Sequence, residues 1–300
     1  NATGQDAPTP TNVDGIPVRT RVRNNRIKDI ISGQADNQYS GGIKFSRNSV
    51  TNAMVGHGHI ITGNIISDVG EMGIELWGQS GHSSIVSHNL TENSEWGISL
   101  NAANRCIISA NKTQNHSVIA VELAEGCQHC TITGNVIYQY DSGGSRLSAP
   151  GISCSSGDHG KNSITGNVIV GTSGRAIYID SGENYSIVGN QINHCGIGVY
   201  LKFAERVQVR SNYLDVTETG IYLDCDTGGS AVTFSGYAFC GNTFAGTMSY
   251  ANIALYDGAP TSRECTFENV TIMDNDFSLA SADVFVIHTH LISEDKLVNY

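Results

Sequence analysis

The hexapeptide ITGNVI occurs twice, at residues 132–137 and again at residues 164–169, and it decides the fold. Looser copies elsewhere carry an apolar residue, two small or polar residues, an asparagine, any residue and a second apolar residue. The asparagines of these copies are Asn25, Asn64, Asn89, Asn111, Asn135, Asn167, Asn190, Asn212, Asn242 and Asn275. Seven of the nine intervals between them lie between 22 and 32 residues, a spacing typical of one turn of a coil.

A second motif follows most of these asparagines by eight to ten residues, and it predicts strands. It is a small residue followed by apolar residues in alternation, as in GIELW (73–77), AVELA (120–124) and GIYLD (220–224). No segment keeps a period of 3.6, so helices are excluded. A unit this short cannot bury its own apolar row, and copies must therefore stack about 4.8 Å apart as parallel strands.

We therefore predict an all-β fold, a single right-handed parallel β-helix (solenoid) of about ten rungs. We assign residues 21–290 to the β-helix, residues 1–20 to an N-terminal lead-in or cap, and residues 291–300 to a C-terminal tail or cap. Caps are expected because open strand ends invite edge pairing. We expect the repeated asparagines to adopt the left-handed conformation at turns and to bond neighbouring turn backbone or the next asparagine.

Composition narrows the classes of function. The net charge is −11 and no basic cluster occurs, which argues against nucleic acid and against membrane insertion. The eight cysteines are widely spread, and the one CxxC, Cys127 and Cys130, has no second pair at zinc-site spacing. We therefore expect no metal and no cofactor.

Alternation places positions two and four of each second-motif strand in the core and positions three and five on a shared outer face. Position three reads Lys44, Glu75, Ser99, Glu122, Ser153, Tyr178, Tyr200, Tyr222, Ala254 and Phe285. Position five reads Ser46, Trp77, Asn101, Ala124, Ser155, Asp180, Lys202, Asp224, Tyr256 and Ile287. This face combines carboxylates with aromatic rings, so we take it as the candidate site.

The carboxylates on this face form two pairs, Glu75 with Glu122 and Asp180 with Asp224. Members of each pair lie two rungs apart, about 9.6 Å between backbones, which side chains could shorten to the roughly 6.5–9.5 Å used by inverting glycosidases. Either pair is a candidate acid and base; Lys202 between the aspartates also fits a surface charge ladder. We expect the neighbour Trp77 to raise the pKa of Glu75, as a general acid requires.

Aromatic residues on the same face are candidates for substrate binding. Tyr178, Tyr200 and Tyr222 stack rung on rung, and their flat rings suit sugar faces or contact with a subunit. The full set of candidate binding residues is Trp77, Asn101, Tyr178, Tyr200, Lys202, Tyr222 and Tyr256. Glycine- and serine-rich insertions at 32–41, 51–60, 140–150 and 226–236 are predicted to project as loops, with Asp141, Arg146, Asp158 and His159 as secondary candidates.

Residues 20–290 resemble the pectate-lyase-type right-handed β-helix superfamily with its short repeats, and in particular the body of a phage tailspike or related polysaccharide depolymerase. That resemblance implies an extracellular or virion-surface homotrimer whose partner is a bacterial surface or extracellular polysaccharide. The function it implies is an endo-glycosidase (glycoside hydrolase) using Glu75, Glu122, Asp180 and Asp224.

Two alternatives remain open. A polysaccharide lyase acting on a uronate would use Lys44, Lys202, Arg175 or a tyrosine as base and charge neutraliser. A non-catalytic adhesin or receptor-binding module would need the tyrosines alone.

Overall fold

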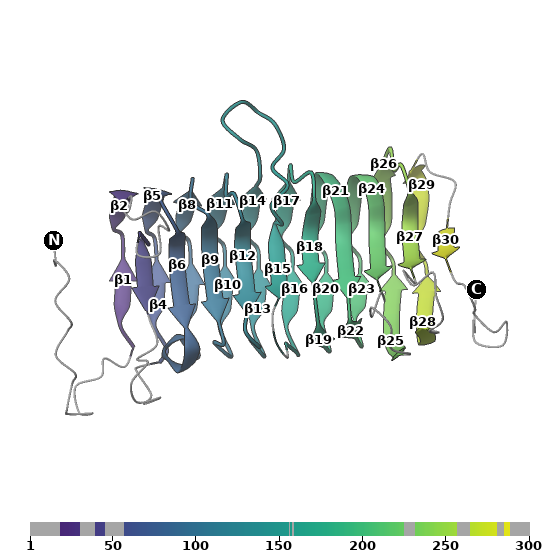
Figure 1. Cartoon of the computed structure of the whole chain (residues 1–300), viewed down its shortest axis with the longest axis horizontal. Coiled ribbons are helices and arrows are strands. Elements are labelled where there is room, and N and C mark those ends of the chain that lie inside the picture. Colours follow the sequence, from purple (N-terminus) through teal and green to yellow (C-terminus); the bar gives the residue numbers. More distant parts are fainter. Residues whose placement is uncertain are drawn as a thin grey trace.

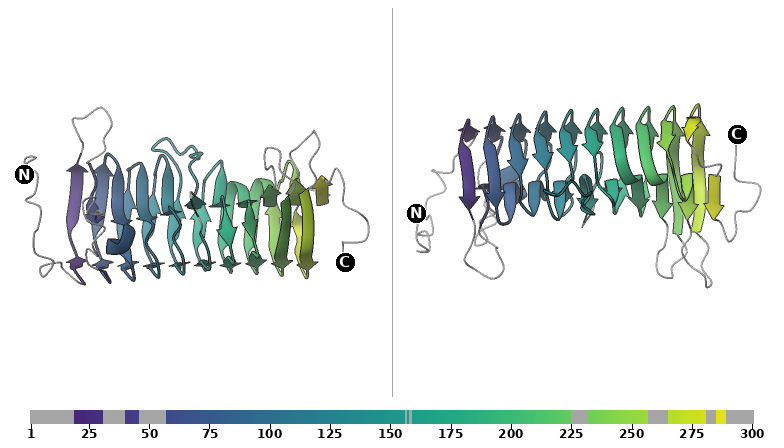
Figure 2. Two further views of the ribbon diagram at one scale, coloured as in Figure 1. Left: turned by 60° about the horizontal axis from the view of Figure 1, so that its bottom comes forward. Right: turned by 90° about the horizontal axis from the view of Figure 1, so that it is seen from above.

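The computed structural model describes residues 19–30, 40–45, 57–155, 157, 159–224, 232–256, 265–280 and 285–288. The chain winds into an elongated coil in which three rows of short parallel strands run along one axis (Figures 1 and 2). The predicted right-handed parallel β-helix of about ten rungs is confirmed. Among the described residues, no helix has both the length and the apolar character needed to cross a membrane.

Each rung contributes one strand to each of three sheets, which we name sheets 1, 2 and 3 in chain order. Sheet 1 consists of β1 (Arg21–Arg23), β4 (Ile60–Thr62), β7 (Ile85–Ser87), β10 (Ile107–Ser109), β13 (Thr131–Thr133), β16 (Ser163–Thr165), β20 (Ser186–Val188), β23 (Gln208–Arg210), β25 (Val232–Cys240) and β28 (Cys265–Met273). Sheet 2 consists of β2 (Arg26–Ile30), β5 (Ile65–Val69), β8 (Leu90–Glu92), β11 (Lys112–Gln114), β14 (Val136–Tyr138), β17 (Val168–Val170), the first parts of β21 (Gln191–Lys202) and β24 (Tyr213–Asp224), β26 (Thr243–Gly246) and β29 (Asp276–Ala280).

Sheet 3 carries the candidate site. It consists of β3 (Ile43–Phe45), β6 (Met72–Trp77), β9 (Trp96–Asn101), β12 (Ile119–Ala124), β15 (Ile152–Ser155), β18 (Arg175–Ile179), the last parts of β21 and β24, β27 (Ala251–Tyr256) and β30 (Phe285–His288). The short strands β19 (Gly182–Glu183) and β22 (Ala204–Glu205) pair after sheet 3, and a 3-10 turn, η2, spans Gly78–Gly81.

Apolar rows from the three sheets fill the interior. The central residue of each middle strand of sheet 1 is completely buried, as in Ile61, Val86, Ile108, Ile132, Ile164, Ile187 and Val209. The predicted inner positions of sheet 3 are likewise buried, for example Ile74, Ile98 and Ile177. Burial of these rows removes apolar surface from water along the whole coil, which is why the rungs hold only as a stack.

The ten repeated asparagines form one continuous ladder between sheets 1 and 2. In every step the side-chain Nδ2 donates to Oδ1 of the next asparagine at 2.9–3.0 Å. The same Oδ1 also accepts the backbone N–H of the preceding asparagine, as between Asn89 and Asn111 at 3.0 Å. The predicted bond to the next asparagine is therefore confirmed.

The predicted left-handed conformation of these asparagines is wrong. The positive φ belongs to the residue before each of them, for example Asn24 (55°), His88 (55°) and Ala110 (53°). The physical reason is that each ladder asparagine aims its backbone N–H along the axis at the next rung, as a strand residue does. The chain turns between sheets 1 and 2 at the residue before each ladder asparagine. In some rungs that residue is a glycine, for example Gly134 or Gly166.

The predicted register of the last rung of sheet 3 is also wrong. Phe285, not Val284, lies opposite Ile253, and Val286 lies opposite Ala254. The cause is that residues 284–287 are all apolar, so alternation gives no signal there. The predicted caps, Ser46 and most of the insertions 32–41, 51–60 and 226–236 lie outside the described residues.

Candidate functional site

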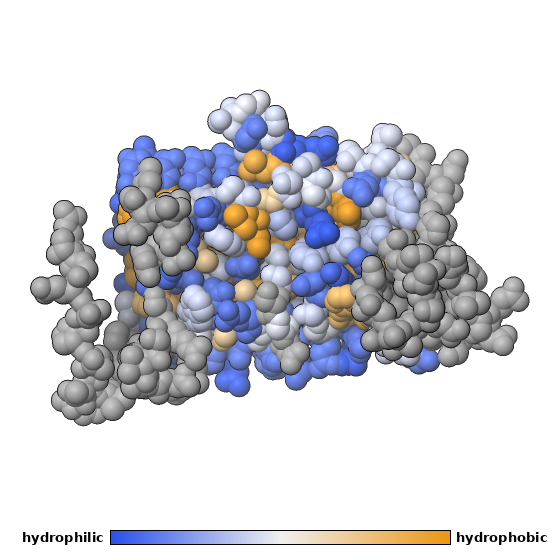
Figure 3. All heavy atoms as spheres, viewed as in Figure 1, coloured by the Kyte–Doolittle hydropathy of each residue, from blue (hydrophilic) through white to orange (hydrophobic). Residues whose placement is uncertain are grey.

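The strand register confirms that the predicted residues from Lys44 to Ala254 share one row of sheet 3, but Glu75, Ser99, Ser153 and Ala254 are buried in it. Lys44 lies opposite Glu75, Glu75 opposite Ser99, and Ser99 opposite Glu122. Further along, the row continues through Ser153, Tyr178, Tyr200, Tyr222 and Ala254. The face seen in Figure 1 includes this sheet, and Figure 3 shows hydrophilic residues there interspersed with separate apolar ones.

The first part of the row is an acidic cluster, which we define as Lys44, Glu71, Glu75, Ser99, Asn101 and Glu122. Lys44 Nζ lies 2.7 Å from a carboxylate oxygen of Glu75 and 3.7 Å from one of Glu71. Asn101 Nδ2 donates to Glu75 at 3.5 Å and to Ser99 Oγ at 3.1 Å. Ser99 Oγ in turn donates to Glu122 at 2.7 Å, so the predicted glutamate pair is connected through two polar side chains.

Burial changes the proton affinity of this cluster. The Glu75 side chain is 1% exposed and its carboxylate is tied to Lys44, whereas Glu122 is 9% exposed. Burial raises the pKa of Glu122, and the hydrogen bond from Ser99 opposes this effect. Burial also raises the pKa of Glu71. Glu122 is therefore a carboxyl whose surroundings suit a proton donor.

The lysine of the cluster is held in its charged form. Burial acts to lower the pKa of Lys44, but the hydrogen bond to Glu75 and the charges of Glu75 and Glu71 outweigh it, and the pKa is raised. Lys44 therefore cannot serve as the neutral base of a lyase near neutral pH.

The second part of the row is a tyrosine cluster, which we define as Arg175, Tyr178, Asp180, Tyr200, Tyr222 and Asp224. Tyr178 donates its hydroxyl to Asp180 at 2.8 Å, and Tyr200 donates to Asp224. Asp224 is 9% exposed and Asp180 is half-buried. Asp180 therefore accepts from Tyr178, two residues earlier in the chain, and Asp224 accepts from Tyr200, one rung earlier.

The tyrosine rings pack against one another along the axis. Tyr200 and Tyr222 are stacked with centroids 5.0 Å apart, and Tyr178 meets Tyr200 edge to face at 5.5 Å. The Arg175 guanidinium lies 4.5 Å from the Tyr178 ring centroid and 4.1 Å from that of Tyr200. Neighbouring rings and the Arg175 guanidinium therefore cover ring faces within the cluster. A ligand on this face would meet ring edges and hydroxyls instead of the open ring faces that the sequence suggested.

The aspartates keep these phenols protonated. Burial, followed by the hydrogen bond to Asp180, raises the pKa of Tyr178, and burial with the bond to Asp224 does the same for Tyr200. Both hydroxyls therefore remain hydrogen-bond donors over the physiological range of pH. Neither tyrosine is placed to act as a ready base, which the lyase alternative would require.

The remaining predicted residues flank the two clusters. Trp77 lies opposite Asn101 in the register, and both occupy the acidic end of the face. Lys202 lies opposite Asp224, with its Nζ 5.0 Å from the Phe203 ring centroid. The Tyr256 backbone lies opposite Asp224, but its side chain is outside the described atoms.

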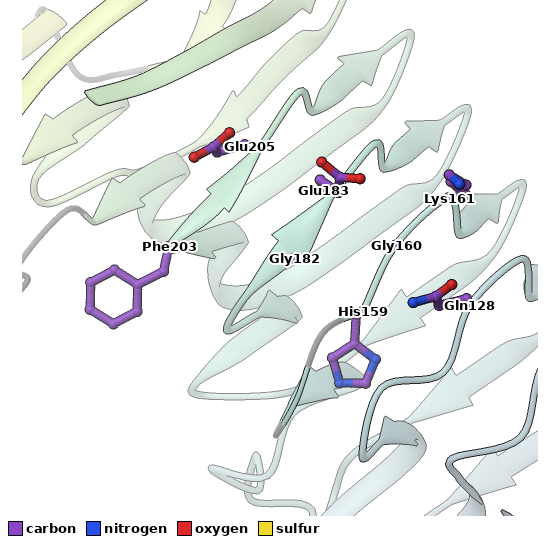
Figure 4. A pocket seen from close by; sticks show the side chains of 8 residues that line it. All are labelled: Gln128, His159, Gly160, Lys161, Gly182, Glu183, Phe203 and Glu205. Atoms are coloured by element: carbon purple, nitrogen blue, oxygen red, sulfur yellow. The ribbon is translucent and has the colours of Figure 1, made fainter. Parts of the chain in front are cut away.

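A pocket of about 430 Å³ opens beside the tyrosine cluster, where the chain leaves sheet 3. Figure 4 shows its lining residues: Gln128, His159, Gly160, Lys161, Gly182, Glu183, Phe203 and Glu205. Of these, sequence reasoning had singled out only His159. The others come from the turns and short strands that follow sheet 3 in four successive rungs. They share no sequence motif, so the sequence did not predict that they line one pocket.

Two more residues were missed or undervalued. Glu71 lies in the bend before β6, where alternation does not apply, yet it contacts Lys44. Arg175 was named only as a lyase option, although it contacts two rings of the tyrosine cluster. Its place at the start of an outer-facing strand was the one available signal.

The insertion at 140–150 projects from the turn between sheets 2 and 3 (Figure 1). Asp141 accepts the backbone N–H groups of Gly143 and Ser145 at 2.8 and 2.7 Å, so it shapes its own loop. Arg146 reaches back to the carbonyl oxygen of His194 at 3.2 Å and to Thr217 at 3.4 Å. These two secondary candidates thus hold the loop and do not join the outer row; Asp158 lies outside the described residues.

The class of protein that this fold and face define is a right-handed parallel β-helix, and solved structures agree. The periplasmic alginate epimerase AlgG matches with a TM-score of 0.60 at 14% identity, over 85% of this chain and 61% of that one. The catalytic unit of a thermostable GH87 α-1,3-glucanase from Streptomyces thermodiastaticus matches with a TM-score of 0.55 at 16% identity, over 89% and 57%. A mutant tailspike protein of E. coli bacteriophage HK620, in complex with a pentasaccharide, matches with 0.53 at 12% identity, over 84% and 53%.

A family model described as periplasmic copper-binding protein (NosD) matches residues 11–244. The chain belongs to this NosD family. Curated protein sequences give no match to it. The chain spans about three fifths of the length of the alginate epimerase that it resembles.

The family description raises the question of copper, and the described residues do not fit a copper site. Nowhere in the described ranges do three or more His, Cys, Asp or Glu side chains come together so as to hold a metal ion. The buried thiols of Cys106, Cys127 and Cys130 donate to the backbone carbonyls of Gly81, Leu100 and Ala103. Hydrogen bonding among these three thiols lowers the pKa of Cys130 to about 4 and raises that of Cys106 and Cys127, so the group offers one thiolate where a copper site needs several.

Proposed function

We propose that the chain is a polysaccharide-cleaving enzyme, an endo-glycoside hydrolase, whose acid and base are Asp224 and Asp180. The observation that carries this is the tyrosine cluster, in which the two carboxylates stand two rungs apart on one outer face, each hydrogen-bonded to a tyrosine hydroxyl. Two rungs are about 9.6 Å, close to the spacing used by inverting glycosidases, which must admit a water molecule.

The two aspartates differ in their access to water, and this suggests their roles. Asp180 is the more exposed, so we assign it to the activation of the attacking water. Asp224 is nearly enclosed and accepts the Tyr200 hydroxyl at Oδ2, so we assign its protonated form, with the proton on Oδ1, to protonation of the leaving oxygen. The hydroxyls of Tyr178 and Tyr200 fix the carboxylates in place, and Arg175 fixes the rings.

The acidic cluster supports substrate binding further along the same face. Its glutamates are bound to Lys44, Ser99 and Asn101, and Trp77 adds an aromatic ring beside them. Glu122 could donate a proton but has no accessible partner base, since Glu75 is tied to Lys44. We therefore place binding there and the chemistry at the aspartates.

Fold neighbours support a carbohydrate substrate. Three of them are an alginate epimerase, an α-1,3-glucanase and a tailspike in complex with a pentasaccharide. The NosD family and the alginate epimerase are both described as periplasmic, which supports a location in the periplasm or outside the cell. The virion surface expected from the tailspike resemblance has no such support.

Reducing-end release, recorded with absorbance at 235 nm, tests the proposal on a panel containing alginate, α-1,3-glucan and bacterial capsule and O-antigen polysaccharides. We expect reducing ends without absorbance, and a loss of at least about 100-fold for Asp180→Asn and for Asp224→Asn, as for removal of an acid or base. Glu75→Gln and Glu122→Gln should lose tenfold or less. Asp29→Asn, the same substitution at an exposed site on the first rung, is the control.

A lyase is the second candidate, and Arg175 favours it, because a guanidinium next to two phenols could neutralise a uronate carboxylate. Absorbance at 235 nm that is lost in Arg175→Ala and kept in Asp180→Asn would replace the hydrolase with a lyase. Binding without turnover on every glycan would leave a glycan-binding module.

A further inference from the structure

The pocket in Figure 4 is lined by residues that follow the tyrosine cluster closely in the chain. Gly182 follows Asp180 by two residues, and Phe203 comes directly after Lys202. Two residues of extended chain span about 7 Å, so the pocket begins within that reach of the proposed base. A group bound there would lie to one side of a chain that follows the outer row of sheet 3.

The floor of the pocket is backbone. Gly182 has a φ of +101°, and a Cβ on it would collide with the carbonyl oxygen of His159. Gly160 pairs with Glu183 across the same floor. Only glycine allows this close approach, so the two rungs leave an open shelf where side chains would otherwise stand.

One wall of the pocket is aromatic. The Phe203 ring is half-buried and lies on the same side as the His159 ring, as Figure 4 shows. His159 is 2% exposed, and its Nε2 lies 2.9 Å from the carbonyl oxygen of Ser155, so it supports the wall from behind and offers a ligand almost no surface. Phe203 also stacks on Phe234 and lies under Lys202, so the exposed remainder of its ring is the apolar surface that a ligand would contact.

The polar wall carries charges that already compensate one another. Glu183 and Glu205 both form ion pairs with Arg206, and the distance from Glu205 to Arg206 is 3.3 Å. Lys161 lies on the rung before Glu183. Gln128 adds an amide. Such a wall offers hydrogen-bond donors and acceptors without a strong net charge, which disfavours both anionic and cationic ligands.

We propose that this pocket binds one neutral hexopyranose unit, carried as a side branch of the polysaccharide that lies along sheet 3. An aromatic ring on one side and several donors and acceptors on the other match the apolar face and the hydroxyl rim of such a sugar. The position of the branch rests on the proposed function; the binding of the sugar does not require turnover.

Saturation-transfer NMR with methyl hexosides tests the site directly, using the methyl glycosides of glucose, galactose and mannose. We expect a signal from at least one of them in the wild type, and at least a threefold weaker signal in Phe203→Ala. Tyr138→Ala, which removes an exposed ring from sheet 2, should leave it unchanged. Since Phe203 also packs on the core, Glu205→Gln serves as a second variant that removes only a polar contact.

Charged probes distinguish this sugar class from others. Methyl glucuronide and glucosamine should give weaker signals than the neutral sugars; equal or stronger signals would overturn the neutral assignment. The absence of signal from every neutral sugar, or a signal unchanged in both Phe203→Ala and Glu205→Gln, would overturn the site. Asp180→Asn should keep the signal, so a failure of the proposed chemistry and a failure of this pocket give different results.

Discussion

His116 is a single ionisable side chain placed wholly inside the coil, at the bend between sheets 2 and 3. Its ring nitrogens lie 3.2 Å from the Thr91 hydroxyl and 2.9 Å from that of Ser94, and its side chain has no exposed surface. Burial lowers its pKa from 6.5 to about 4. The folded protein therefore contains this histidine in its neutral form under conditions in which the unfolded chain protonates it.

This difference predicts a loss of stability in acid. As the pH falls from 6.5 to 4, the unfolded state binds a proton at His116 that the folded state does not bind. The free energy of unfolding therefore falls by about 3 kcal/mol. We expect His116→Gln to be less stable than the wild type at pH 7.5 but to show a flatter dependence between pH 6.5 and 4.5, measured by urea denaturation. His57→Gln, at an exposed site, should keep the wild-type slope; an unchanged slope in His116→Gln would refute the assignment.

Single residues also show what the sequence could predict at the site. Alternation correctly predicted that Glu75, Ser99 and Glu122 form one row, because period two follows from strand geometry alone. It did not predict Glu71, the second partner of Lys44, because Glu71 lies in a bend. Nor did it predict how the tyrosine rings turn, since ring rotation depends on Arg175 and on hydrogen bonds to Asp180 and Asp224.

At the scale of the element, an asparagine inside the ladder should contribute more to stability than one at its end. Asn111 bonds Asn135 and the carbonyl oxygen of Val86 and accepts two bonds from Asn89. Asn275 has no later asparagine in the ladder and is only half-buried. Removal of the internal amide leaves several buried polar groups without partners.

We therefore expect Asn111→Ala to lower the free energy of unfolding by about 3–5 kcal/mol, and Asn275→Ala by about 1 kcal/mol. Chemical denaturation of both variants, with fluorescence as the signal, gives the comparison. Equal losses at the two positions would contradict the larger contribution assigned to the internal asparagine.

Strands differed in how well the sequence predicted them. Sheet 3 was predicted in register from Lys44 to Ala254, because small residues and alternation mark each strand. The prediction failed at β30, where consecutive apolar residues give no alternation. The pocket could not be predicted at all, since it depends on how turns of four rungs lie beside one another.

At the scale of the whole molecule, stability should vary along the axis. In sheet 2 the middle strands, such as β11 and β17, bury their central residue, whereas β2 and β29 near the two ends contain no buried residue. In a stack of rungs each one is stabilised only by its neighbours, so terminal rungs open first.

Hydrogen exchange followed by mass spectrometry should show this gradient. We expect peptides from residues 85–224 to exchange at least tenfold more slowly than peptides from residues 21–30 and 265–280. Uniform protection along the chain would instead indicate that the coil opens as one unit.

Assembly is the other property of the whole molecule. The homotrimer expected from the resemblance to tailspikes stays a prediction. Light scattering on the purified protein should give three times the mass of the chain, and a mass of one chain would contradict it.

The uniformity of the asparagine ladder has a consequence for how such a protein can change in length. Every joint between rungs has the same chemistry, an amide that donates to the next amide. A segment that begins just after one ladder asparagine and ends at the next could be duplicated or excised, and the new joint would be identical to the old one. The coil is therefore free to grow or shorten in whole turns, while its chemical face is extended or trimmed one subsite at a time.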